Sequence, residues 1–116
     1  MLLINGLGEI EEKINLVNIK LEEINNLYEN NKLEKNNEDK LKEEIENLKT
    51  NWFKAQDKLA FFIEHDELEK VSKCLVVLEE NCKNNEYTNA LEDGKEFIYW
   101  LNHFREKDSL KLKNIF

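Results

Sequence analysis

Apolar residues recur every three or four positions along four stretches of the chain. This is the spacing of a helix that presents one face to other helices. The four stripes cover residues 7–28, 41–62, 68–82 and 87–104. No window of comparable length alternates apolar and polar residues, as a strand would. The pattern therefore predicts an all-α protein.

Polar breaks rich in asparagine separate the stripes, and asparagine favours turns and helix caps over helix interiors. Four asparagines lie between residues 30 and 37, and Asn84-Asn85 precede the last stripe. Asp66 followed by Glu69 has the spacing of a capping box, with Asp66 as the N-cap. These signals predict helices at about residues 7–31, 37–64, 67–83 and 86–107. A short tail from Ser109 to Phe116 is expected to follow.

Short connections make consecutive helices antiparallel. The predicted fold of residues 1–116 is therefore a single domain, an antiparallel four-helix up-down bundle built from two helical hairpins. The first two helices are longer than the last two, so their hairpin is expected to project. Gly94, alone within the fourth helix, is expected to allow close helix packing.

Apolar residues exceed the stripes at one end of the predicted bundle, near the N-terminus. Residues 59–63 and 97–101 are apolar on every helical face, which indicates burial or contact with a partner. The expected core anchors are Trp52, Leu59, Phe62, Leu75 and Leu101. The candidates for an exposed surface that binds another protein, or a second copy, are Phe53, Phe61, Tyr99 and Trp100.

The formal net charge is −8, and Arg105 is the single arginine. Binding to phosphates needs lysine and arginine, so nucleic acid is not an expected partner. The acidity also disfavours anionic lipid surfaces. No segment approaches the ~20 apolar residues of a membrane span.

Two histidines and two cysteines are the residues that could carry chemistry. His65, His103, Glu67 and Glu106 are weak candidates for a metal site, but the Glu-x-x-His pattern of ferritin-like di-iron bundles is absent. Cys74 and Cys82 are about 12 Å apart along one helix, too far for a disulfide, and are expected to be buried. No catalytic residue and no cofactor are expected.

The chain also resembles a family of small bacterial proteins, the domain of unknown function numbered 4363. The resemblance covers roughly residues 8–116 and rests on Trp52, Leu59-Ala60, Ile63, His65, Glu67, Asn85-Glu86 and a closing Ser109-Leu110 and Asn114-Ile115-Phe116. It implies a helical domain outside the membrane, tethered by an N-terminal anchor that this chain lacks. It also implies a link to sporulation or germination.

The expected function is that of a non-enzymatic interaction module, extracytoplasmic and membrane-tethered in its full-length form. One alternative is a ligand-sensing domain with a pocket between helices at the apolar end, lined by Trp52 and Phe62. The other is a metal-binding helical-bundle enzyme.

Overall fold

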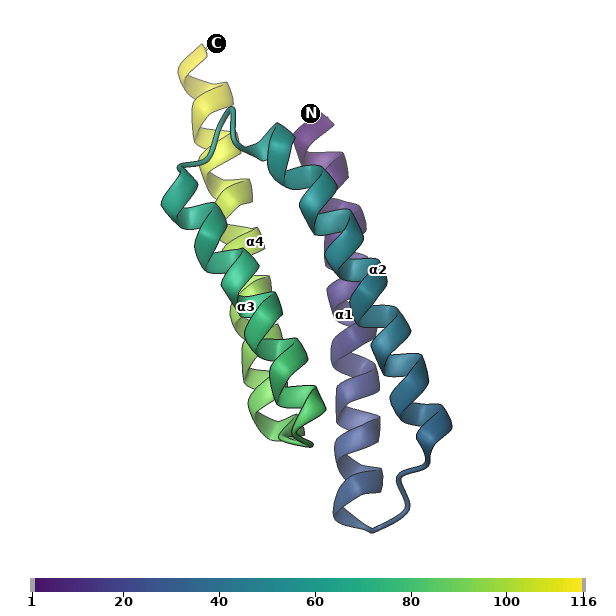
Figure 1. The fold of residues 1–116 in the computed structure, drawn as a ribbon. Coiled ribbons are helices and arrows are strands. Elements are labelled where there is room, and N and C mark those ends of the chain that lie inside the picture. The colour runs from purple at the N-terminus through teal and green to yellow at the C-terminus, as the bar shows by residue number, and fades with distance from the viewer. Residues whose placement is uncertain (1, 116) are drawn as a thin grey trace.

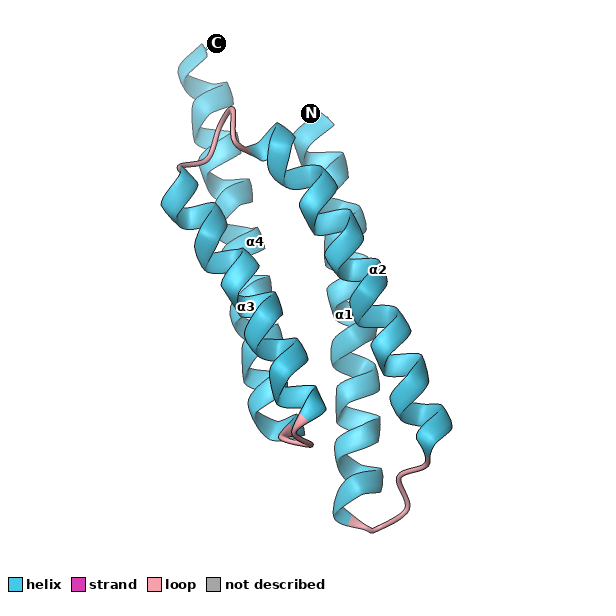
Figure 2. Cartoon of the chain, in the orientation of Figure 1, coloured by secondary structure: helices cyan, strands magenta, loops and turns pink. Residues whose placement is uncertain are grey.

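The computed structural model describes the backbone of residues 2–115 and the side chains of residues 7–107. Its four helices are α1 (Leu2–Glu29), α2 (Lys35–Leu59), α3 (His65–Lys83) and α4 (Tyr87–Ile115). They run alternately up and down as two hairpins, with the connections confined to the ends (Figure 2). The predicted all-α four-helix bundle is confirmed.

The helices do not pack equally against one another. α1 packs closely against both α2 and α4, and α3 packs closely against α4, whereas α2 and α3 contact each other much less. The α1/α2 hairpin extends beyond the α3/α4 hairpin at the end opposite the termini, as the helix lengths predicted (Figure 1). One side of the bundle, between α2 and α3, is therefore more open than the rest.

The predicted C-terminal tail is wrong, because α4 continues through Ile115. No proline or glycine follows Gly94, so nothing in the local sequence stops the helix. α1 likewise begins at Leu2 rather than near residue 7.

The turn between α2 and α3 differs from its prediction. α2 ends at Leu59 instead of residue 64, and the Leu59 carbonyl accepts bonds from the N–H groups of Phe62 at 2.9 Å and Ile63 at 2.8 Å. This tight turn buries Ile63, whereas Phe62 is 46% exposed. Phe62 was therefore wrongly predicted as a core anchor.

The polar breaks in the sequence coincide with the ends of helices. Asn31 and Asn85 adopt left-handed conformations, with φ of 57° and 58°, which asparagine tolerates better than most residues. Asp66 is not the N-cap of α3: Glu64 holds that position without a side-chain bond. Asp66 lies in the first turn instead, where a carboxylate interacts favourably with the helix dipole.

The apolar stripes form the core, apart from Tyr28 and Phe62, which are about half exposed. Trp52 is fully buried at its centre. Its ring lies 5.8 Å from that of Phe97 and 6.5 Å from that of Phe104, so α2 meets α4 through these aromatics. Leu59, Leu75 and Leu101 are also buried, as predicted.

At Gly94, α4 lies directly against the Asn18 side chain of α1. A Cβ atom at this position would lie 1.9 Å from Oδ1 of Asn18, which is impossible without movement. Only glycine leaves room for the Asn18 side chain here. The predicted role in close packing is confirmed.

Candidate functional site

The open side of the bundle, which we call the α2/α3 seam, is bridged by two polar contacts. The Trp52 indole N–H donates to Oγ of Ser72 at 2.9 Å. Nζ of Lys49 lies 3.1 Å from the Glu79 carboxylate. The hydrogen bond to Glu79 raises the pKa of Lys49 above its ordinary value, against the opposing effect of burial. Between these contacts, side chains of both helices line the seam.

Large apolar side chains are exposed on both helices beside the seam. Val76 is 59% exposed and lies one turn from Ser72, so it shares the face of α3 that looks toward α2. Phe53 is 47% exposed and lies one turn from Lys49 on α2. Val77, 37% exposed, lies about 100° further round α3 than Val76. The seam is therefore flanked by apolar surface that no helix of the bundle covers.

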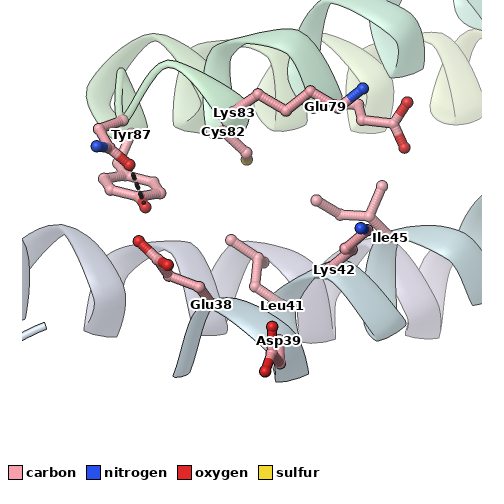
Figure 3. Close-up of a pocket in the computed structure, with 10 residues that line it drawn as sticks. Glu38, Asp39, Leu41, Lys42, Ile45, Glu79, Cys82, Lys83 and Tyr87 are labelled. Atoms are coloured by element: carbon pink, nitrogen blue, oxygen red, sulfur yellow. Dashed lines mark hydrogen bonds between the residues drawn. The ribbon is translucent and has the colours of Figure 1, made fainter. Parts of the chain in front are cut away.

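A cavity of about 230 Å³ occupies the end of the seam farthest from the termini. It lies between the first half of α2 and the α3–α4 corner, as Figure 3 shows. Its lining residues are Glu38, Asp39, Leu41, Lys42, Ile45, Glu79, Cys82, Lys83, Asn85 and Tyr87. The predicted alternative placed a pocket at the apolar end beside Trp52 and Phe62, so the position of this cavity differs from that prediction.

The two cysteines lie in surroundings that keep their thiols protonated. Burial, with the carboxylates of Glu96 and Asp93, raises the pKa of Cys74 to about 12. Burial, with Asp93 and Glu79, raises the pKa of Cys82 to about 12. A thiolate nucleophile needs the opposite environment.

The predicted interaction residues do not form one patch. Phe53 lies beside the seam and Phe61, 84% exposed, lies in the turn after α2. Tyr99 and Trp100 lie on α4, on the far side of the bundle from α2. Trp100 is partly buried, with Nζ of Lys70 5.3 Å from its ring centre.

Of the four weak metal candidates, only Glu67 and His103 come together. His65 pairs with Glu69 at 2.9 Å on the exposed face of α3. Glu67 instead receives hydrogen bonds from Lys107, at 2.7 Å to each oxygen, and lies 3.4 Å from His103. The hydrogen bond from Lys107 is the main cause that lowers the pKa of Glu67. Glu106 is exposed. Among the residues that the structure describes, no three histidine, cysteine or carboxylate side chains are grouped to hold a metal ion.

Sequence reasoning missed most of the seam. Val76 belongs to an apolar run, and its exposure required knowing which side of α3 faces α4. Lys49 and Glu79 are 30 residues apart, and no local pattern joins them. Leu41 and Ile45 form the apolar part of the cavity, but the sequence pattern identified them only as members of an apolar stripe.

These features define an all-α bundle with one open side and no described cluster of catalytic groups. The chain belongs to the family described as Domain of unknown function (DUF4363), whose model matches residues 9–115. No match was found among curated proteins or among solved structures. Within the described residues, none of the helices is both long enough and apolar enough to cross a bilayer.

Proposed function

We propose that this chain is a non-enzymatic interaction module, which docks an amphipathic helix of a partner protein along the α2/α3 seam. The observation that carries the proposal is the weak packing between α2 and α3, combined with exposed Phe53 and Val76 on the two helices. Grooves between helices commonly take the apolar face of a third helix.

The chemistry of the groups beside the seam supports binding rather than catalysis. Cys82 carries a protonated thiol, and Lys49 and Glu79 neutralise each other across the seam. A partner helix that displaces neither contact would still cover Phe53 and Val76. Binding of this kind gains from apolar burial, at about 25 cal/mol for each Å² removed from water.

Adjacent valines on α3 offer a matched test. A photo-crosslinking amino acid at position 76 lies on the same face of α3 as Ser72, whereas at position 77 it lies about 100° further round the helix. In cells that express the natural protein, position 76 is expected to crosslink to a specific partner and position 77 is not. Equal crosslinking at both positions, or none at position 76, would contradict the proposal.

A substitution pair sharpens the result. Val76→Glu is expected to abolish the crosslink formed from a second seam position, Phe53, while Val77→Glu leaves it intact. Both valines are exposed, so neither change should lower the free energy of unfolding by more than about 0.5 kcal/mol. Circular dichroism of the purified variants checks this.

We also propose that the domain is displayed outside the membrane on a tether before α1, in a process linked to sporulation or germination. The family resemblance supports this, and the arrangement suits it: the N-terminus and the cavity lie at opposite ends of the bundle (Figure 1). Protease added to intact cells is expected to digest the domain, and protection of the domain would refute the proposal.

A further inference from the structure

The cavity at the end of the α2/α3 seam has an apolar floor. Leu41 and Ile45 are buried core residues of α2, and in Figure 3 their side chains point toward Cys82 on α3. The Cys82 thiol is protonated and behaves as a small apolar group. An aliphatic chain placed over this floor would exchange water for apolar contacts.

Charge is distributed unevenly around the cavity. Figure 3 shows the Glu38 side chain directed toward Tyr87 at one end, while Asp39 points away from the cavity. The ammonium groups of Lys42 and Lys83 lie toward Ile45 and Glu79 at the other end. The end formed by Glu38 and Tyr87 therefore has a carboxylate with no lysine drawn beside it.

Tyr87 adds a hydrogen-bond acceptor at the same end. Its hydroxyl donates to Oδ1 of Asn85 at 3.0 Å, which leaves the hydroxyl oxygen able to accept a hydrogen bond. The Tyr87 ring is buried and packs 5.5 Å from the ring of Tyr28, so the hydroxyl is the group that Tyr87 offers to a ligand. Glu38 and Tyr87 together offer the groups that an ammonium ion needs.

The titration of the lining residues agrees with this distribution. Burial is the largest cause that raises the pKa of Tyr87 to about 12, and the negative charge of Glu38 is the next. Burial also raises the pKa of Cys82 to about 12, with Asp93 and Glu79 adding to it. Burial opposes a charge of either sign, so only the contribution of Glu38 at Tyr87 favours a positive charge at this end of the cavity.

We propose that this cavity binds a small primary alkylamine, with its ammonium at Glu38 and Tyr87 and its aliphatic chain over Leu41, Ile45 and Cys82. The volume of about 230 Å³ suits a short chain. This site is independent of the proposed partner helix, because it lies beyond Phe53 and Val76 on the seam.

An NMR titration of the isotopically labelled protein tests the proposal with three probes. Hexylamine is expected to give saturable shifts of backbone amides at residues 38–45 and 79–87. Methylamine, which lacks the chain, should bind at least about tenfold more weakly, since each buried CH₂ contributes roughly 0.8 kcal/mol. Hexanoate has the same chain and the opposite charge, so it should not give saturable shifts.

Two substitutions on the exposed surface of α2 complete the experiment. Glu38→Gln is expected to weaken hexylamine binding about fivefold, as for the loss of a partly exposed ion pair. Glu43→Gln, on the same helix and outside the cavity, should leave the affinity unchanged. Shifts spread over the whole acidic surface, equal effects of the two substitutions, or equal binding of hexanoate would each overturn the proposal.

Discussion

The α1/α4 interface is closely packed, whereas the α2/α3 seam is not. At the α1/α4 interface, Gly94 lets the helices approach until Asn18 fills the space above it, and Arg105 forms an ion pair with Glu11. At the seam, the helices are joined mainly by Trp52–Ser72 and Lys49–Glu79 and leave a cavity and exposed apolar side chains. The two hairpins are therefore held together far more by α1 and α4 than by α2 and α3.

Trp52 connects the seam to α4, because it contacts Ser72 on α3 and the rings of Phe97 and Phe104 on α4. Trp52→Ala removes a fully buried ring that touches α3 and α4, so we expect a loss of about 3–5 kcal/mol in the free energy of unfolding. Phe53→Ala, one position along, should change it by no more than about 0.5 kcal/mol. Chemical denaturation followed by far-ultraviolet circular dichroism measures both. Similar losses for the two variants would show that Phe53 is packed.

Gly94 and Gly8 form a matched pair of helical glycines. An added Cβ at Gly8 meets nothing within 4 Å, whereas at Gly94 it collides with Asn18. Gly8→Ala should stabilise the protein by up to about 1 kcal/mol through helix propensity. Gly94→Ala should leave it about 1–3 kcal/mol less stable than Gly8→Ala, because of overpacking.

The double variant Asn18→Ala with Gly94→Ala separates the collision from other effects. Removing the Asn18 side chain makes room for the new methyl group, so the two substitutions should couple favourably by at least about 0.5 kcal/mol. Thermal and urea denaturation of all four proteins gives this coupling. Additive effects would mean that α1 and α4 are not in close contact at Gly94.

The ion pair between α3 and α4 and the ion pair across the seam should respond differently to pH. Glu67, held by Lys107 between α3 and α4, has a lowered pKa, so its contribution is present above the unfolded pKa and is lost as pH falls through the folded value. Lys49, held by Glu79 across the seam, has a raised pKa, so its contribution is lost as pH rises through the folded value. Each pair should contribute about 0.2–1 kcal/mol.

Unfolding free energies at a series of pH values test this contrast. The difference between the natural protein and Glu67→Gln should shrink at acid pH, and the difference from Lys49→Met should shrink at alkaline pH. Lys54→Met, on the exposed face of α2, is the control for loss of a lysine charge. A pH-independent difference for either variant would show that its ion pair contributes nothing.

The sequence by itself determined the number and order of the helices and the residues of the core. Spacing of three or four is a local property, so it identifies Trp52, Leu59, Leu75 and Leu101 without knowledge of their neighbours. The role of Gly94 was predictable for the same reason. The end of α2 was not, because a helical pattern through Phe62 gives no sign that a tight turn would bury Ile63 instead.

Only the tertiary structure decided where the bundle is open. Whether Val76 or Val77 faces the seam, and whether Lys49 meets Glu79, depends on how far α2 stands from α3. That distance depends on how the two hairpins pack together through α1 and α4. Side-chain periodicity along one helix carries no information about it. The same holds for the cavity at Glu38 and Tyr87, since its two walls come from helices that are far apart in the sequence.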